Sequence, residues 1–145
     1  MADYTADMAN QDLPLIEAAL KALSNKDRQH LDDSLRWMDE GDSFGEWHTP
    51  APKEGVSQWP YLVYSDRVKH LTQALYDVGL VVSFDWNSWG HAVGTDSLPT
   101  EDPIDAVKTI TTILRAERFN DGFKLKNCES GHLQAAVRTV VACTS

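Results

Sequence analysis

Paired cysteines and metal-binding spacings are missing from this sequence. Cys128 and Cys143 are the only cysteines among 145 residues, and neither stands in the C-x-x-C spacing of zinc sites and redox dithiols. We therefore expect two reduced thiols. The five histidines are dispersed, with none in H-E-x-x-H or H-x-x-x-H spacing. The sequence predicts no metal or other cofactor, and a metal site could only be assembled from distant segments.

Long apolar runs are missing too. The apolar residues come in short groups, whereas a membrane span needs roughly 18 in succession. The first residues, MADYTADMANQD, are acidic and lack the apolar segment of a signal peptide. We expect a soluble, cytoplasmic protein that does not contact membranes. A hydrophobic content of 42% in 145 residues suits one core, which predicts a tail over residues 1–10 and a single domain over residues 11–145.

Basic residues are scarce, because 13 Lys and Arg against 22 Asp and Glu give a net charge of −9. Residues 1–46 carry eleven acidic and four basic side chains, whereas residues 104–145 carry four acidic and six basic ones. A negative field repels phosphate backbones, which argues against direct nucleic-acid binding. The acidic front of the chain is either a solvated surface or a surface for a basic protein partner.

Two groups of apolar residues at helical spacing lie before Gly41 and predict an antiparallel pair of helices. Asp12 is the expected N-cap of the first helix, with Pro14 in its first turn, where a missing N–H does no harm. Asn25 is expected to open the second helix, and Gly41 to follow its end. The apolar positions are Leu13, Ile16, Leu20 and Leu23 in the first helix and Leu31, Leu35 and Met38 in the second.

Three further helices are predicted after residue 65. Ser65 or Asp66 caps the first of them, which ends at Gly79. Pro103, directly after Asp102, begins the next, because proline suits the first position of a helix. The apolar positions of the three helices are Val68, Leu71, Leu75 and Val78; Val107, Ile110 and Leu114; and Leu133, Val137 and Val140 or Val141.

Only the segments YLVYS (61–65) and LVVSF (80–84) have the character of strands. They either pair as a small ribbon or serve as buried extended connectors. The stretch between Gly41 and Ser65 is a long central loop, of a length that usually has a function. We therefore predict a mainly α fold: a single-domain bundle of about five helices with a long central loop and at most a small two-stranded β ribbon.

Three stretches outside the helical patterns combine aromatic, acidic and basic side chains: GDSFGEWH (41–48), FDWNSW (84–89) and ILRAERF (113–119). Arg115 and Arg118 lie three residues apart on one side of a predicted helix, where two guanidinium groups can grip a carboxylate or phosphate. We predict that the three stretches form one aromatic-lined cleft. Its ligand-binding residues are Asp42, Ser43, Phe44, Trp47, His48, Asp85, Trp86, Trp89, Arg115 and Arg118.

Each stretch also has a structural interpretation. Asp42 or Ser43 can cap the turn after a helix while Gly45 permits a positive φ. Arg115 can form an internal ion pair with an aspartate. Ser43 and His48 suggest a nucleophile and a base, but G-D-S-F-G follows a predicted helix, whereas a G-x-S-x-G nucleophile elbow follows a strand. We predict no catalytic residues.

The order of several motifs resembles a known family. WMDEGDSFGEWH is followed by WPYLVYS, by ALYDVGLVVSFDWNSW, by TTILRAERFNDG and by a terminal SGHL. Over about residues 35–133, this succession is similar to an uncharacterised bacterial and phage family, the domain of unknown function 6508. The resemblance implies a small stand-alone domain and brings no established activity with it.

Three functions from different classes remain. The preferred one is a non-enzymatic binding module whose cleft takes a small ligand, for example a nucleotide, or a peptide. The second is an acidic interaction protein of the kind with which phages occupy the nucleic-acid channel of a host machine, such as a defence complex. The third is an enzyme in which Asp42, His48, Asp85 and Arg115 converge.

Overall fold

Six helices and one antiparallel β hairpin make up the part of the chain that is described. The computed structural model describes residues 6–41, 43–84, 86 and 102–143. The mainly α fold predicted from the sequence is confirmed. The elements are α1 (Ala6–Lys21), α2 (Asn25–Asp39), β1 (Gly45–His48), β2 (Tyr61–Tyr64), α3 (Asp66–Asp77), α5 (Pro103–Ala116), α6 (Phe123–Glu129) and α7 (His132–Ala142).

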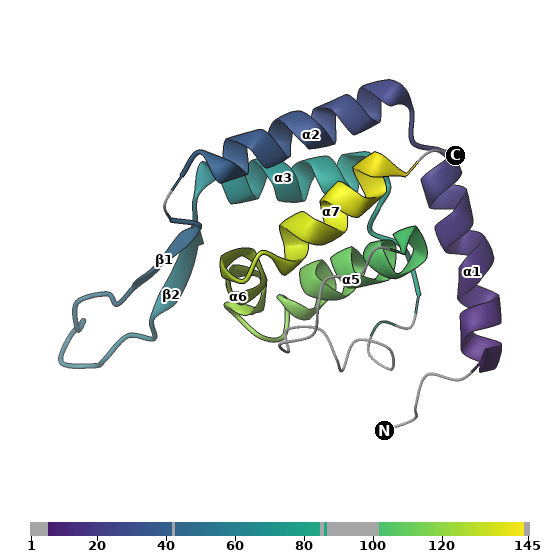
Figure 1. Cartoon of the computed structure of the whole chain (residues 1–145). Helices are drawn as coiled ribbons and strands as arrows, with labels where there is room; N and C mark the ends of the chain where they lie inside the picture. The colour runs from purple at the N-terminus through teal and green to yellow at the C-terminus, as the bar shows by residue number, and fades with distance from the viewer. Residues whose placement is uncertain (1–5, 42, 85, 87–101, 144–145) are drawn as a thin grey trace.

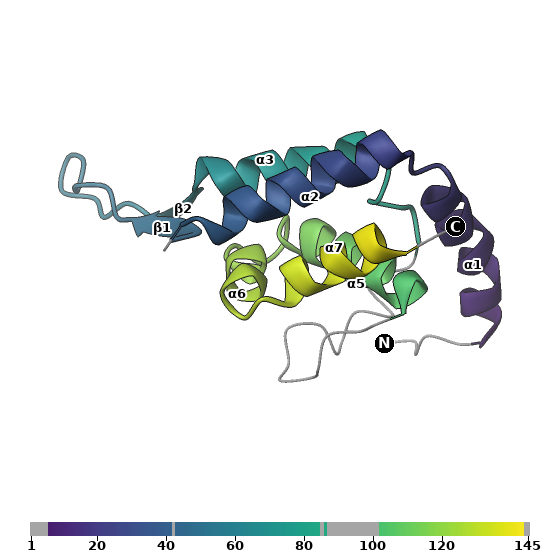
Figure 2. The same ribbon diagram turned by 45° about the horizontal axis from the view of Figure 1, so that its top comes forward.

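The helices pack in two layers. Helices α2 and α3 lie side by side, α7 packs against α2, and α5 lies beside α7, with α6 at one end of α7 (Figure 1). The same layering is visible after a 45° rotation (Figure 2), which also shows α1 at the end of the body away from the hairpin. The antiparallel pair predicted for the first two helices is not formed, because α1 packs against α5 whereas α2 packs against α3 and α7 (Figure 1).

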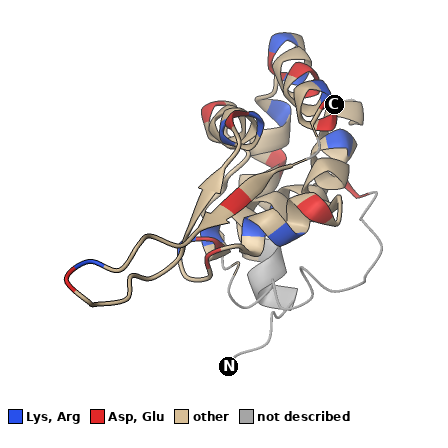
Figure 3. Ribbon diagram, turned by 90° about the vertical axis from the view of Figure 1, so that its left-hand side faces the viewer, with Lys and Arg blue, Asp and Glu red and all other residues tan. Residues whose placement is uncertain are grey.

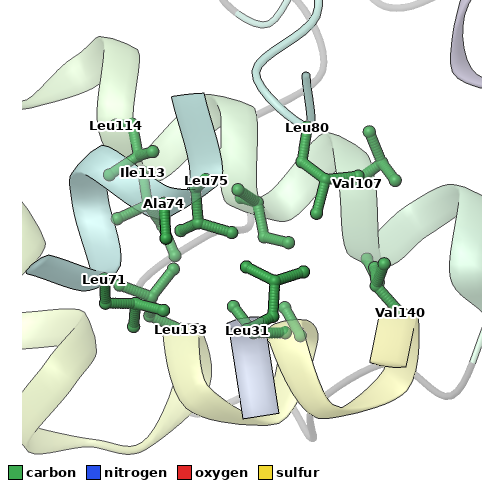
Figure 4. Close-up of a cluster of buried hydrophobic side chains, with 14 of the residues drawn as sticks. Leu31, Leu71, Ala74, Leu75, Leu80, Val107, Ile113, Leu114, Leu133 and Val140 are labelled. Carbon is green, nitrogen blue, oxygen red and sulfur yellow. The ribbon is translucent and has the colours of Figure 1, made fainter. Parts of the chain in front are cut away.

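The core lies between the two layers (Figure 4). The helices predicted from the sequence each contribute an apolar stripe at spacings of three and four, as the periodicity predicted. Full burial of each such side chain contributes about 1.5–3 kcal/mol. The largest fully buried side chains are Ile16, Leu31, Met38, Val68, Leu71, Leu75, Leu80, Val107, Ile110, Ile113, Leu133 and Val137.

The predicted helix starts are confirmed for α3 and α5, and α2 begins as predicted at Asn25. Ser65 caps α3 by accepting a hydrogen bond from the Val68 N–H, and Asp102 caps α5 through the Ile104 N–H at 2.9 Å. The cap of α2 is Ser24, one residue before the predicted opening. Its hydroxyl accepts from the Asp27 N–H at 3.0 Å while the Asp27 carboxylate accepts from the Ser24 N–H at 3.1 Å, which is a capping box.

The start of α1 was predicted wrongly. The helix begins at Ala6, within the expected tail, so Asp12 is an interior residue and not an N-cap. Pro14 also lies inside the helix, where it removes one hydrogen bond of the ladder and its ring crowds the carbonyl of the preceding turn. Alanine and methionine before Asp12 are strong helix formers, and this propensity outweighs the capping character of a single aspartate.

The two candidate strands behave differently. Residues 61–64 form β2, but their partner is β1, inside the stretch GDSFGEWH, and not LVVSF. Residues 80–84 are a connector, as the alternative interpretation held, but the connector is bent at Val81 and Phe84 and only partly buried, with Ser83 exposed. Leu80 and Phe84 are buried, the Val82 N–H donates to the Thr111 hydroxyl at 3.1 Å, and that hydroxyl donates to the Leu80 carbonyl at 3.2 Å. Because the Thr111 side chain of α5 forms hydrogen bonds with the Val82 N–H and the Leu80 carbonyl, these two backbone groups need no strand partner.

Helix α6 was not predicted. It contains only seven residues, too few for a periodic pattern to stand out. Both its N-cap, Gly122 at φ 93°, and the N-cap of α7, Gly131 at φ 82°, are in the left-handed conformation. These two glycines allow three chain segments to turn sharply and bring α5, α6 and α7 together.

The long central loop is a hairpin that projects from the helical body (Figures 1 and 2). We call residues 45–64 the β-arm. At its base Gly45 pairs with Tyr64 and His48 with Tyr61. At its tip Lys53 and Val56 form a second bridge around a turn with positive φ at Glu54 and Gly55, the geometry of a tight hairpin turn. The β-arm is therefore ordered at both ends.

Candidate ligand site at the end of α5

A hollow of about 320 Å³ lies between the last turns of α5 and the connector that follows α3. We call it the α5 hollow. Burial of Ile110, Ile113 and Leu114 fixes the rotation of α5, so that Arg115 lies outside the buried stripe, and Arg118 is exposed in the turn that follows the helix. The full lining is Val82, Ser83, Phe84, Trp86, Arg115, Arg118 and Phe119. The volume is at the lower end of the range for small-ligand sites, about 300–1,000 Å³.

Two aromatic rings form one side of the α5 hollow. Trp86 and Phe119 are stacked, with centroids 6.2 Å apart and planes inclined by 23°. Phe119 is 80% exposed, so this stack is open to solvent. A second hollow of about 400 Å³ lies beside the same pair, against Ala116 and Asn120. Flat aromatic faces that are reachable from solvent can stack on a planar ring of a ligand.

Two arginines supply positive charge to the α5 hollow. Within the described residues, neither Arg115 nor Arg118 forms an ion pair. The ion pairs found there join Arg36 to Asp32 and Asp33, Arg138 to Asp39 and His48 to Glu46. The negative end of the α5 dipole stabilises cations in its last turn. Two guanidinium forks that form no ion pair within the described part of the chain are nevertheless suited to bidentate binding of an anion.

The structure brings Trp86, Arg115 and Arg118 together, out of the ten residues predicted to line a cleft. Asp42, Asp85 and Trp89 lie outside the described residues, as does the predicted contact between an arginine and an aspartate. Ser43, Phe44, Trp47 and His48 belong to the β-arm or to the residues leading into it. Among the described side chains, no ring contact joins Phe44 or Trp47 to Trp86.

The four residues near the β-arm have other neighbours. The Ser43 hydroxyl donates to the Gly45 carbonyl at 3.3 Å, as the turn interpretation expected. The positive φ expected at Gly45 is wrong, because Gly45 is the first residue of β1. Phe44 packs against the core, and His48 stacks on Tyr61 with centroids 5.5 Å apart. Trp47 lies over the backbone of Gly122. Among the described residues, GDSFGEWH therefore does not form one cleft with Trp86. It is not a simple turn either, because it leads into the first strand of the β-arm.

A polar cluster that the sequence did not reveal joins the β-arm to the end of α5. The Glu117 carboxylate accepts hydrogen bonds from the Tyr64 hydroxyl at 2.8 Å, the Gly122 N–H at 3.1 Å and the Lys124 N–H at 3.0 Å. The Tyr64 hydroxyl in turn accepts from the Leu125 N–H at 3.0 Å. Glu117 and Tyr64 therefore satisfy the first N–H groups of α6. No local sequence pattern marks this pairing, since its partners are far apart in the chain.

Burial shifts the titration of the groups in this cluster. Burial and the hydrogen bond to Glu117 raise the pKa of Tyr64 above its usual range. Burial lowers the pKa of Lys124, whose Nζ lies 4.3 Å from the centroid of the Tyr64 ring and donates to the Thr72 hydroxyl at 3.3 Å. Burial also raises the pKa of Cys128 to about 12, so this thiol is protonated and unreactive at neutral pH. Both cysteines are free, as expected.

The described residues were also compared with the requirements of a metal site and of a membrane-spanning helix. No group of three or more His, Cys, Asp or Glu side chains in them is close enough together to hold a metal ion. None of their helices has the length and apolar character needed to cross a membrane.

Fold and site together define a small, mainly α-helical domain with a projecting β-arm and a hollow lined by aromatic and arginine side chains. The chain belongs to the family of unknown function DUF6508, which matches it over residues 18–144. This confirms the resemblance seen in the motifs. Searches of curated proteins and of solved structures gave no match.

Proposed function

We propose that this protein is a binding module whose α5 hollow takes a small organic anion that carries a planar ring, for example a nucleotide. The observation that supports this proposal is the open stack of Trp86 and Phe119 beside two arginines that have no ion-pair partner among the described residues. The rings offer a face for stacking, and the guanidinium groups offer donors for a phosphate or carboxylate.

The electrostatics of the whole chain support an anion at this place. A protein with a net charge of −9 repels anions in general. Residues 104–145, which include Arg115 and Arg118, are by contrast net basic, with six basic against four acidic side chains. An anionic ligand would therefore be attracted to this part of the chain, and its binding would weaken as salt screens the charges.

Calorimetric titration with three probes tests the proposal: a ribonucleoside monophosphate, the corresponding nucleoside and ribose 5-phosphate. We expect the nucleotide to bind most tightly. Arg118→Ala should weaken nucleotide binding by about tenfold to a hundredfold, because a hydrogen bond to a charged group contributes about 1.5–3 kcal/mol, and should leave nucleoside binding unchanged. Phe119→Ala should weaken the binding of both the nucleotide and the nucleoside and leave the binding of ribose 5-phosphate unchanged.

Arg36→Ala is the matched control, because Arg36 lies exposed on α2 and pairs with Asp32. This variant should bind the nucleotide like the wild type. The proposal is wrong if none of the three probes binds, or if Arg118→Ala and Phe119→Ala bind the nucleotide as tightly as Arg36→Ala does.

A second candidate function is protein binding through the β-arm. Trp59 is 90% exposed, and Val56, Tyr61 and Trp47 are exposed as well. Such apolar and aromatic surface on a projecting hairpin is typical of protein-binding sites. Charged side chains are few along the β-arm and gather near its tip (Figure 3).

The test is affinity capture with the wild type and with Trp59→Ser. A specific partner should be retained by the wild type, lost by the variant, and released little by salt, since the contact is apolar. Capture that survives Trp59→Ser but falls steeply with salt would instead favour the acidic-inhibitor hypothesis, in which carboxylates near the N-terminus bind a basic partner.

A further inference from the structure

The β-arm carries much of the exposed apolar surface of the protein. Half of the large apolar side chains that are exposed among the described residues lie on it. They are Trp47, Val56, Trp59, Tyr61 and Val63. The β-arm projects from the helical body in both views (Figures 1 and 2), so these side chains are within reach of another molecule.

A two-stranded sheet is a weak structure by itself. β1 and β2 pair over four residues each. An isolated hairpin is marginally stable at best in water, whereas three or more strands with an apolar face are stable. Tyr64 and Trp47 hold the base of the β-arm on the body, through the hydrogen bond to Glu117 and the contact with Gly122. Further strands would stabilise the β-arm beyond its base.

The strand β1 presents an open edge. Among the described elements it shares extensive contacts with β2 alone. The Ser65 N–H donates to the Phe44 carbonyl at 2.9 Å, and hydrogen-bonded and non-hydrogen-bonded pairs alternate along an antiparallel ladder. The pair of Trp47 with Leu62 is therefore of the second kind, and the backbone N–H and carbonyl of Trp47 point outward. Such an edge is a template for another strand.

We propose that the β-arms of two copies of this chain pair along β1, in antiparallel orientation, and form a four-stranded sheet around a two-fold axis at Trp47. The proposal rests on the second candidate function, protein binding through the β-arm, and names a second copy of the chain as the partner. A strand that pairs with its own copy presents the same surface twice, as in most homodimers. Pro50 and Pro52 follow β1 closely and limit the pairing to this short segment, because proline cannot donate to a ladder.

The charges of β1 favour this register. With Trp47 opposite the partner's Trp47, Glu46 lies opposite the partner's His48, so that an acidic side chain faces a basic one at both places. Pairing centred on Glu46 would instead place two carboxylates opposite each other, which is destabilising. The β-arm has a net charge of −1, from Glu46, Lys53 and Glu54, against −9 for the chain. Pairing through the β-arm therefore keeps most of the negative charge away from the contact.

The exposed area suits a dimer of moderate affinity. Trp59 is 90% exposed, and Trp47 and Tyr61 are about half exposed. An aromatic side chain can bury about 150–250 Å². With Val56 and Val63, two copies offer roughly 1,200 Å², the lower end of the range for specific interfaces. Because the two β-arms run in opposite directions, Trp59 and Val56 of each come beside the base of the other. We expect a dissociation constant on the order of 10 μM.

Sedimentation velocity of the full chain, from well below to well above the expected dissociation constant, tests the proposal. We expect monomer and dimer in a concentration-dependent equilibrium, without larger species. The dissociation constant should not increase with salt, since screening weakens the repulsion between two acidic copies. A wild type that is monomeric at all concentrations overturns the proposal. Affinity capture with Trp59→Ser then decides separately whether the β-arm binds another protein.

Two variants with opposite charges at the same positions test the register. His48→Glu has carboxylates at positions 46 and 48, and the double variant Glu46→Lys with His48→Lys has ammonium groups at both. Each variant alone should dimerise about fivefold to thirtyfold more weakly than the wild type, because like charges face each other twice. An equimolar mixture of the two should form the dimer at least as tightly as the wild type. Both positions are exposed, so the far-UV circular dichroism spectra should not change.

His30→Glu is the matched control, because His30 is an exposed histidine on α2. This variant should dimerise like the wild type. Pairing along β1 is wrong if His48→Glu dimerises as tightly as His30→Glu, or if mixing the two oppositely charged variants does not restore the dimer.

Discussion

The hydroxyl of Tyr64, at the base of the β-arm, donates a hydrogen bond of 2.8 Å to the carboxylate of Glu117 at the end of α5, across 53 positions of the chain. The same carboxylate holds the first N–H groups of α6. One acidic side chain therefore ties the β-arm, α5 and α6 to each other, directly beside the turn that carries Arg118 and Phe119.

Removing this hydroxyl should destabilise the protein. Tyr64→Phe deletes the donor to Glu117 and the acceptor of the Leu125 N–H. A buried group left without its partner costs about 1–3 kcal/mol, and we expect the free energy of unfolding in urea to fall by that amount. Tyr61→Phe, on the exposed face of the same strand, should change it by less than about 0.5 kcal/mol. Equal effects of the two substitutions would contradict the role given to Tyr64.

Gly122 should tolerate a side chain less well than Gly131. Both glycines are helix N-caps with positive φ, so alanine at either position meets the same backbone strain of about 1–2 kcal/mol. At Gly122 the added Cβ would also lie 3.0 Å from a ring carbon of Trp47, whereas at Gly131 nothing lies within 4 Å.

Urea unfolding of the two variants measures the difference. Gly122→Ala should lose more stability than Gly131→Ala and should shift the emission spectrum of the protein, because Trp47 is displaced. Identical losses with an unchanged spectrum would show that Trp47 does not pack on this turn.

Two adjacent threonines of α5 should respond in opposite ways to the same substitution. Thr111 bridges the Val82 N–H and the Leu80 carbonyl, so Thr111→Val leaves two backbone groups of the connector without their partner and should cost about 1–3 kcal/mol. The Thr112 hydroxyl is buried and has no partner among the described residues. Thr112→Val should therefore be neutral or stabilising.

The binding proposal extends this prediction. Because the connector forms one wall of the α5 hollow, Thr111→Val should also weaken the binding of the nucleotide. Thr112→Val should leave that binding unchanged. Thermal or urea unfolding provides the first comparison and calorimetry the second. A Thr112→Val variant that is less stable than Thr111→Val would contradict the hydrogen bonds described for the connector.

Cys128 should make stability decrease at alkaline pH. Burial raises the pKa of this thiol from 9.0 to about 12 in the folded protein. Between these values the unfolded chain loses the thiol proton and the folded chain keeps it, so the free energy of unfolding falls as pH rises, by up to about 1.4 kcal/mol per pH unit. Below pH 9 the contribution of Cys128 is constant.

The measurement is urea unfolding at pH 8, 9 and 10 for the wild type and Cys128→Ala. The variant is expected to be less stable at each pH, because it leaves a small cavity, but its stability should depend less on pH. Cys143 is present in both proteins and cancels in the comparison. Parallel pH profiles would contradict the burial effect.

Much of the fold could be predicted from local chemistry. The caps Ser65 and Asp102 and the apolar stripes through Leu71, Ile110 and Val137 depend on residues a few positions apart, and the sequence displays such relationships directly. The errors came where two local signals competed, as at Asp12, or where an element was too short to have a period, as in α6.

The site was predicted only in part for the same reason. Arg115 lies in the last turn of α5, and Arg118 and Phe119 lie in the hydrogen-bonded turn directly after it, so their proximity follows from their closeness in the sequence. That Trp86 stacks on Phe119 depends on how the connector after α3 crosses α5.

By itself the sequence determined that this is a mainly helical, acidic, single-core chain, because burial stripes, caps and charge are properties of local composition and spacing. Only the tertiary structure decided that GDSFGEWH pairs with YLVY as a β-arm, that Glu117 joins Tyr64 to α6, and that His30 lies beside His70. These are contacts between segments distant in the chain. They depend on which surfaces the packed core brings together, and no local pattern encodes that choice.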